Sequence, residues 1–458
     1  MKHKQLVIAI VACTFLSTDL LHAADLNDLK QACGNRRPSG RPGEHWLETC
    51  ILDFFTLQPV HPAVNSIAPI TGTGVGLGID RVMRENRFEY LPSARALIST
   101  DGSLLFKGSL TIGIPGFIPG PPPTTAGSDN VEDINKSNIR EMARVTDHPE
   151  VDAKASMTLH AERFDLMHQN FYGEGNSTTQ SQLAIYRLQQ TSGGLTAADP
   201  LTTWASASIS ADYVQPNILG ATSTGRPSVV NTYMDASAPG LAHQPGFSRV
   251  QPSVRLLFKP AFAEFIDLRA AYAFYHATSG ADYSFRQFTG SLAAQHKVRI
   301  QRQHTASHYN NLANALCSPL PAKQCSPGDI SAMIFATTSQ TSDNSAVPFF
   351  FQPTLGGANF EGEDTLRGYR DYRFRAPNVM GLQAEFTHQV WGPFGVFGFY
   401  DVGRVGLKTS DLGFSNFHHA LGVGMYVSAG NIVAFRVSVG FGTHEGILAN
   451  PKVASGLF

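Results

Sequence analysis

Charged side chains are scarce in this sequence, making up 16% of its 458 residues, and 35 Lys and Arg are balanced by 36 Asp and Glu. A net charge of -1 gives no long-range attraction to nucleic acid, so nucleic acid is not an expected partner. Beyond the N-terminal segment no run of 18 apolar residues occurs, which excludes a membrane-spanning helix there. A hydrophobic content of 42% excludes a largely disordered chain. A soluble all-β or α/β protein and a membrane β-barrel remain.

Familiar catalytic motifs are also missing. The sequence contains no Gly-x-Ser-x-Gly elbow and no His-Glu-x-x-His helix. The glycines between Gly72 and Gly78 recur at every second residue, which does not fit the nucleotide-binding pattern G-x-G-x-x-G. His418 and His419 are adjacent, so on a strand they would face opposite sides and could not share a metal ion. We therefore predict that the protein is not an enzyme and has no cofactor or metal site.

The N-terminus predicts export. Basic residues precede an apolar run, and residues 1–23 end in the small-residue pattern of a cleaved secretory signal. An alternative is that Cys13 ends a lipobox and becomes lipidated.

Removal of the signal leaves an even number of cysteines, as disulfide-bonded exported proteins commonly have. None of them shows the Cys-x-x-Cys spacing of a zinc site. We predict two local disulfides as the simplest pairing, although the sequence does not fix the connectivity: Cys33 with Cys50 and Cys317 with Cys325.

Two regions that differ in composition and hydrophobic pattern follow the signal. Residues 24–70 are rich in Arg and Pro and too short for a compact domain, so we predict a short periplasmic segment. From residue 71 to 458 the sequence alternates apolar with small or polar residues, as in 153–162 and 433–441. Arg436 lies on the polar side of the second segment, which suits a hydrated lumen better than a dry core.

A soluble sandwich gives the same alternation, so periodicity does not decide between the two folds. The export signal, the long polar connections and the terminal Phe458 together favour an all-β fold, a transmembrane antiparallel β-barrel in the bacterial outer membrane. The mature length leaves roughly 27 residues per strand and connection in a barrel of sixteen strands. Fourteen or eighteen strands also satisfy this arithmetic. Candidate strands lie near 88–100, 103–115, 178–190, 201–213, 249–260, 263–276 and 282–302, and 119–150, 216–244 and 304–329 are predicted extracellular loops.

Two short motifs in the last hundred residues carry a resemblance. Arg367-Gly368-Tyr369 follows a segment that contains Gly356 and Gly357, and Phe399-Tyr400-Asp401-Val402-Gly403 comes about thirty residues later. In this order the motifs resemble those of the BamA/TamA outer-membrane barrel superfamily, which includes the two-partner-secretion transporters and is often labelled bacterial surface antigen.

The resemblance implies specific roles for these residues. Arg367, Gly368 and Tyr369 would lie on a lumenal loop near 355–378, and Asp401, with Gly403, would be the partner of Arg367 on the barrel wall. Because Asp401 shares its parity with Phe397 and Phe399, all three would face inward. In a lumen, a guanidinium can bind a carboxylate through two hydrogen bonds and so fix the loop.

For function, the resemblance implies insertion or translocation of polypeptides, with outer-membrane lipid and unfolded outer-membrane or secreted polypeptides as partners. The relatives of BamA and TamA carry periplasmic POTRA domains that residues 24–70 cannot contain, so the short members without them are the closer comparison. The glycine row at 72–78 and Pro451 and Gly456 near the end predict weak pairing between first and last strands. A passive pore and a structural or lipid-handling barrel are the alternatives.

Overall fold

The computed structural model describes residues 60–80, 83–85, 88–113, 155–221, 225–279, 283–298, 328–342, 345–360, 362–391, 394–429, 432–443 and 445–453. The signal sequence and the four cysteines of the predicted disulfides, Cys33, Cys50, Cys317 and Cys325, lie outside these ranges. Within them, no helix has both the length and the apolar character needed to cross a membrane.

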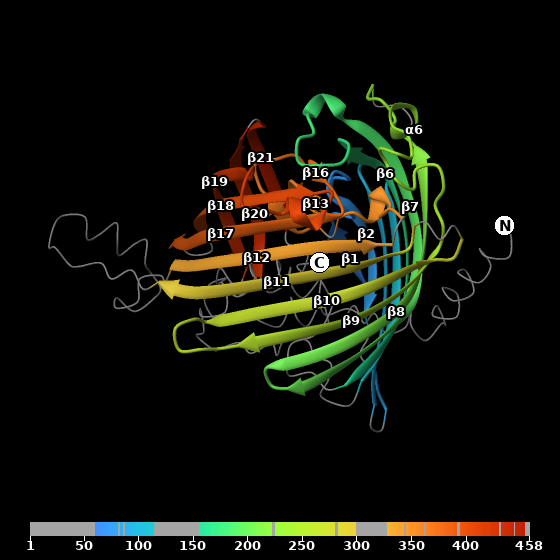
Figure 1. The fold of residues 1–458 in the computed structure, drawn as a ribbon. Helices are drawn as coiled ribbons and strands as arrows, with labels where there is room; N and C mark the ends of the chain where they lie inside the picture. Colours follow the sequence, from blue (N-terminus) through green and yellow to red (C-terminus); the bar gives the residue numbers. More distant parts are fainter. Residues whose placement is uncertain are drawn as a thin grey trace.

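One large antiparallel sheet makes up almost all of the described structure (Figure 1). Each long strand pairs with the next one along the chain. The strands are β1 (Val60–Asn65), β2 (Gly74–Asp80), β3 (Met83–Glu85), β4 (Phe88–Ser99), β5 (Leu104–Gly113), β6 (Ser156–Phe171), β7 (Ala184–Thr202), β8 (Ala205–Gly220), β9 (Phe247–Phe258), β10 (Phe265–Ala277), β11 (Phe285–Val298), β12 (Gly328–Thr341), β17 (Asn378–Trp391), β18 (Phe394–Gly406), β19 (His418–Ala429), β20 (Ile432–Gly442) and β21 (Gly446–Val453).

These segments occupy sixteen strand positions. β2 and β3 both pair with β4 in a single register, which runs from Asp80 opposite Ser93 to Met83 opposite Tyr90. They therefore form one strand position, and the described sheet has sixteen strand positions, as predicted.

The sheet begins earlier than the sequence pattern indicates. β1 lies inside the stretch 24–70 that we predicted to precede the barrel, and it pairs with β2 over its whole length. Its sequence, Val-His-Pro-Ala-Val-Asn, is short and contains a proline, which weakens a strand prediction. As the first strand of the sheet it has only β2 as a partner among the described residues, a position in which proline is tolerated.

The predicted strands at 178–190 and 201–213 are wrong in their bounds. The chain instead forms one long strand, β7, that ends at Thr202, and β8 begins at Ala205. Gly193 and Gly194, which lie between the two predicted strands, are in the middle of β7. A side chain at Gly194 would approach the Asp212 carboxylate to 2.2 Å, so glycine lets β8 pack closely here.

Of the three predicted extracellular loops, 119–150 and all but the last two residues of 304–329 lie outside the described residues. Because antiparallel strands alternate in direction, β8, which leads into the predicted loop 216–244, ends at the opposite end of the sheet from β5 and β11. The prediction that all three loops are extracellular therefore conflicts with the strand directions. We name the end with the β6–β7, β8–β9, β12–β17 and β18–β19 connections the strap end. The other, the terminal end, contains Val60 and Val453.

The two faces of the sheet differ in polarity in the sense expected of a lipid-facing barrel. Apolar side chains on the outer face are exposed, for example Leu421 (61%), Val423 (63%) and Met425 (61%) on β19. The same face is apolar on other strands, with exposed Leu77, Phe106, Leu159, Ile209, Val254, Phe288, Ile334 and Phe386. The inner face buries polar residues instead, among them Glu89, Asp212, Asp267, Asp329, Gln383, Glu385 and Asp401. An exposed apolar belt of this extent requires a nonpolar surrounding, which a bilayer supplies.

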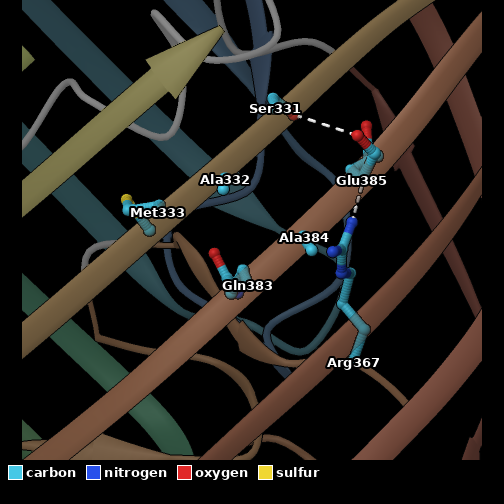
Figure 2. Close-up of a pocket in the computed structure, with 7 residues that line it drawn as sticks. All are labelled: Ser331, Ala332, Met333, Arg367, Gln383, Ala384 and Glu385. Carbon is cyan, nitrogen blue, oxygen red and sulfur yellow. Dashed lines mark hydrogen bonds and ion pairs between the residues drawn. The ribbon is translucent and has the colours of Figure 1, made fainter. Parts of the chain in front are cut away.

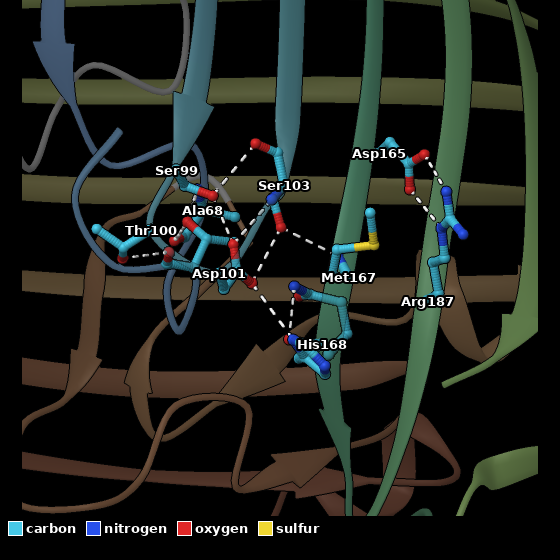
Figure 3. A network of polar contacts seen from close by, with 11 residues as sticks. Ala68, Ser99, Thr100, Asp101, Ser103, Asp165, Met167, His168 and Arg187 are labelled. Atoms are coloured by element: carbon cyan, nitrogen blue, oxygen red, sulfur yellow. Dashed lines mark hydrogen bonds and ion pairs between the residues drawn. The ribbon is translucent and has the colours of Figure 1, made fainter. Parts of the chain in front are cut away.

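A polar network organises the strap end near β4, β5 and β6 (Figure 3). Asp101, in the β4–β5 turn, accepts hydrogen bonds from Ser99 and from the backbone N–H and hydroxyl of Ser103. Burial would raise the pKa of Asp101, but these hydrogen bonds hold it below its ordinary value. Ser103 also accepts the backbone N–H of Met167 (3.0 Å), which ties the turn to β6.

Candidate functional site

Residues 345–377, between β12 and β17, cross the interior of the sheet, and we call this segment the strap. It contains four short strands, β13 (Thr354–Leu355), β14 (Gly357–Ala358), β15 (Asp364–Leu366) and β16 (Phe374–Arg375), which pair with one another and not with the large sheet. Figure 1 shows β13 and β16 surrounded by the curved sheet. The predicted lumenal loop near 355–378 lies within the strap, apart from its last residue, which begins β17.

Arg367 and Asp401 are in direct contact. The Arg367 guanidinium donates from Nε to Oδ2 (2.8 Å) and from Nη2 to Oδ1 (2.6 Å) of Asp401, and the Arg367 backbone N–H donates to Oδ2 (2.9 Å). Both side chains are shielded from solvent, with 1% of Arg367 and 0% of Asp401 exposed. This two-bond geometry fixes the orientation of the strap as well as its distance from β18.

Two further charged residues complete the cluster. Glu385 on β17 accepts hydrogen bonds from the guanidinium of Arg367 and from that of Arg436 on β20. Two arginines and two carboxylates thus share one buried site, which leaves it without net charge. Because β17 and β20 are separated by two strands in the sheet, their contact also shows that the sheet curves around the site.

Two phenyl rings cover the guanidinium groups. Phe399 and Phe397, on the inner face of β18, lie 4.0 Å from the Arg367 guanidinium and 3.7 Å from that of Arg436 respectively. The rings are buried, with 3% of each exposed. Stacking against an aromatic face supplies attraction to a desolvated cation and keeps water away from it. The inward parity predicted for Asp401, Phe397 and Phe399 is confirmed.

Glycines on β19 and β20 make room for this arrangement. A side chain at Gly422 or Gly424 would meet the ring of Phe399 or Phe397 at 2.3 Å. A Cβ at Gly440 would lie 2.7 Å from the backbone of Gly368 in the strap. The alternating glycines of the sequence therefore form the part of the inner wall against which the rings and the strap pack.

The other motif residues lie at the same contact. Gly368 has a φ of +95°, in the left-handed region that favours glycine, and it packs on the backbone of β20. The Tyr369 hydroxyl donates to the carbonyl of Thr443 (2.9 Å), in the β20–β21 turn. A side chain at Gly403 on β18 would collide with Leu355 of the strap.

Arg373 and Arg375 attach the other side of the strap. Arg373 pairs with Glu445 and donates to the hydroxyl (3.0 Å) and carbonyl (2.7 Å) of Thr178 in the β6–β7 connection. Arg375 donates to the carbonyl of Phe349 (2.6 Å) and to the hydroxyl of Tyr186 on β7 (3.3 Å). Contacts to β7 on one side and to β18 and β20 on the other show that the strap spans the interior.

A small cavity lies beside the Arg367 guanidinium, between β12 and β17 (Figure 2). Its volume of about 10 Å³ accommodates about one water molecule, which is too little for an organic ligand. Figure 2 shows Arg367 and Ser331 both reaching Glu385, Ser331 through a long hydrogen bond to its carbonyl (3.5 Å). The buried cluster is therefore a structural contact and does not form a substrate pocket.

Glu174 provides a titratable contact between the strap and the β6–β7 connection. It accepts a hydrogen bond from Gln352 of the strap. Burial raises the pKa of Glu174 from 4.5 to about 6, and the hydrogen bond from Gln352 and the charge of Arg375 oppose this rise only in part. The folded state therefore favours the protonated form of this carboxyl.

We expect the docking of the β6–β7 connection onto the strap to depend on pH. Because the folded-state pKa is raised, the contribution of Glu174 to stability is fully present below pH 4.5 and is lost as the pH rises through about 6. Hydrogen exchange of residues 172–183, corrected for intrinsic rates, should show more protection at about pH 4 than at about pH 7.5. In Glu174→Gln this difference should shrink, and an unchanged difference would assign it to another group.

Four of the residues in this site were not predicted as site residues: Glu385, Arg436, Arg373 and Arg375. Alternation along β17 and β20 places Glu385 and Arg436 on the inner face of the sheet. A charged residue on that face predicts an oppositely charged partner in the lumen, so the sequence did contain a signal for these two residues. Arg373 and Arg375 lack such a signal, because their partners at residues 178 and 186 are almost two hundred positions away in the sequence.

No family model matches the sequence, and no curated protein matches it. Among solved structures, the chain is similar to BamA from Haemophilus ducreyi lacking POTRA domains 1-3, at 10% identity and a TM-score of 0.48, over 94% of this chain and 83% of that one. It is also similar to CdiB from Acinetobacter baumannii, at 9% identity and a TM-score of 0.46, over 87% of this chain and 60% of that one. It is similar as well to CdiB from Escherichia coli, at 10% identity and a TM-score of 0.44, over 94% of this chain and 74% of that one. The chain thus spans less than two thirds of the Acinetobacter protein, and these similarities assign no activity to it.

Proposed function

We propose that this chain is an outer-membrane β-barrel of the BamA/TamA-like surface antigen superfamily, and that it inserts or translocates polypeptides across the bacterial outer membrane. The single observation that carries the proposal is the strap that crosses the interior and is fixed to the inner wall by Arg367 and Asp401. The two residues belong to the motifs that resemble that superfamily, and their contact supports the roles that the resemblance implies.

The inside-out polarity of the sheet supports the proposed location. Exposed apolar side chains on the outer face match the lipid-facing band of such barrels, and the buried charges of the inner face match a polar lumen. With the N-terminal segment in the periplasm, the terminal end would face the periplasm and the strap end the cell exterior. A passive pore fits less well, because a strap attached on both sides obstructs the interior.

The proposed route for a polypeptide is the seam between the first and last strands. The glycine row predicted to weaken the first strand lies mostly in β2, which pairs with both β1 and β4, so it does not border the seam. The first strand, β1, has six residues, and β21 contains Pro451, which cannot donate a backbone hydrogen bond. Within the described residues, β1 pairs with β2 and β21 pairs with β20, and no pairing joins β1 to β21. A seam with few hydrogen bonds would open at a lower free-energy cost than any other strand pair.

Disulfide trapping of the seam tests this proposal. In a chain whose own cysteines are replaced by serine, pairs of cysteines with one member on β1 and the other on β21 would be screened for crosslinking by oxidation, and a pair that crosslinks would be used. We expect the crosslink to abolish the assembly of other outer-membrane barrels, read as their heat-modifiable gel mobility, and reduction to restore it.

A matched control crosslinks two strands that are already paired. Ser93 on β4 and Ser109 on β5 are opposite one another in the register, so a disulfide between them should leave assembly unchanged. If the trapped seam supports assembly as well as this control does, the gate hypothesis is wrong.

A further inference from the structure

A second site lies at the strap end, away from the Arg367 cluster. The β6–β7 connection, the β8–β9 connection and the strap together enclose a cavity of about 320 Å³. Cavities of this size are in the range that binds small molecules. It is lined by Tyr172, Gln180, Ser181, Leu183, Arg226, Pro227 and Arg370.

The cavity has two arginines and no acidic side chain in its lining. Among the described residues, neither Arg226 nor Arg370 forms an ion pair or a hydrogen bond through its guanidinium, whereas Arg367, Arg373 and Arg375 all do. An arginine that is not needed to hold the fold together retains its donors for a ligand.

Tyr172, which lines the cavity, senses both arginines. Burial raises the pKa of Tyr172, while the positive charges of Arg370, Arg373 and Arg226 act in the opposite direction. Only 1% of its surface is exposed and its hydroxyl is itself buried, so the donors that a ligand can reach here are those of the two arginines.

The carboxylate whose charge acts on Tyr172 is committed to other partners. It belongs to Glu445, which is paired with Arg373 and accepts a hydrogen bond from Gln180 (2.9 Å). The Arg373 guanidinium also lies 4.9 Å from the Tyr172 ring, so Arg373 is held by these contacts. Two positive charges therefore remain for a bound anion.

We propose that this cavity binds a phosphate monoester group, with Arg226 and Arg370 as its counter-charges and hydrogen-bond donors. A phosphate monoester carries close to two negative charges at neutral pH and three acceptor oxygens, which matches two guanidinium groups, whereas a carboxylate supplies one charge. The cavity is larger than a phosphate ion and leaves space for the group that bears it.

The source of the phosphate is either a soluble phosphorylated molecule or a phosphate-bearing lipid headgroup, and the test separates the two. Glucose 6-phosphate is titrated into the purified full chain by calorimetry, and phosphatidic acid is offered in vesicles against phosphatidylcholine. Binding of glucose 6-phosphate in detergent indicates a soluble ligand, and binding of phosphatidic acid vesicles alone indicates a headgroup. In either arm the proposal requires acetate not to compete.

The variants Arg370→Gln and Arg226→Gln should each weaken binding about tenfold or more, because each removes a charge-assisted hydrogen bond. Tyr172→Phe, which keeps the ring and removes only the buried hydroxyl, should leave affinity unchanged. Lys408→Gln removes the same charge from an exposed position at the strap end that does not line the cavity, and it should leave affinity unchanged.

Equal binding by the arginine variants and Lys408→Gln, or no phosphate binding in either arm, would overturn the proposal. Circular dichroism and heat-modifiable mobility confirm that each variant folds. The site would bind phosphate whether or not the barrel handles polypeptides, so the two proposals fail independently.

Discussion

Arg367→Ala is expected to destabilise the folded barrel by about 3–5 kcal/mol, because it leaves two buried carboxylates facing one remaining guanidinium. Asp401 would lose both of its guanidinium hydrogen bonds, and Glu385 would retain only Arg436. The strap would also lose its attachment to β18, so we expect a higher single-channel conductance. The measurements are the unfolding midpoint in urea in lipid vesicles and conductance in planar bilayers.

A second arginine–aspartate pair in the same protein is a matched control. Arg187 and Asp165 form the same two-bond geometry, at 2.7 and 2.6 Å, but 33% of the arginine side chain and 15% of the aspartate side chain are exposed. Arg187→Ala should therefore lower the free energy of unfolding by at most about 1 kcal/mol and leave conductance unchanged.

The double variant Arg367→Ala/Asp401→Ala separates the pair from its surroundings. Removing both partners should cost less than the sum of the two single changes, since no unpaired Asp401 carboxylate remains. Wild-type stability and conductance in Arg367→Ala would refute the role assigned to this contact.

Gly440→Ala is expected to push the strap away from β20. The added Cβ would lie 2.7 Å from both the nitrogen and the Cα of Gly368, and backbone atoms cannot move aside as a flexible side chain can. Overpacking of this kind lowers the free energy of unfolding by about 1–3 kcal/mol, and the larger side chain of Gly440→Val should lower it by more than that. We expect protease sensitivity of the strap and conductance to rise together.

Gly398→Ala supplies the control for this change. Gly398 lies on β18, which β19 separates from β20, and the nearest atom to its added Cβ is 3.8 Å away, which is an ordinary contact. Since both Gly440→Ala and Arg367→Ala act by releasing the strap, their combination should cost less than the sum of the two. Full additivity, or an effect of Gly440→Ala no larger than that of Gly398→Ala, would contradict the packing described for the strap.

Much of the fold is predictable from the sequence because the outer and inner faces of each strand differ in polarity. The alternation in 153–162 places Met157 and Leu159 outward, and both are exposed in the structure. The errors arise where a local signal conflicts with the sheet. Gly193 and Gly194 fall between two predicted strands, yet the pairing of β7 with β6 and β8 on both sides keeps them in a strand.

The contact between Arg367 and Asp401 is anticipated by their motifs, whereas the rest of the cluster depends on the curvature of the sheet. Arg436 has the correct parity for an inward position, but only the approach of β20 to β17 across two strands brings it to Glu385. Arg373 and Arg375 bind residues that precede them by nearly two hundred positions in the sequence, and no local sequence pattern predicts contacts between segments so far apart. The phosphate cavity likewise combines three separate segments of the chain.

The measurement that tests the proposed function most directly is the outer-membrane proteome after depletion of this protein, compared with cells that retain a wild-type copy. We predict a loss of other outer-membrane barrels or of specific secreted polypeptides, restored by the wild-type chain but not by the chain with a crosslinked seam. An unchanged proteome would contradict the proposal and would indicate a pore or a lipid-handling barrel.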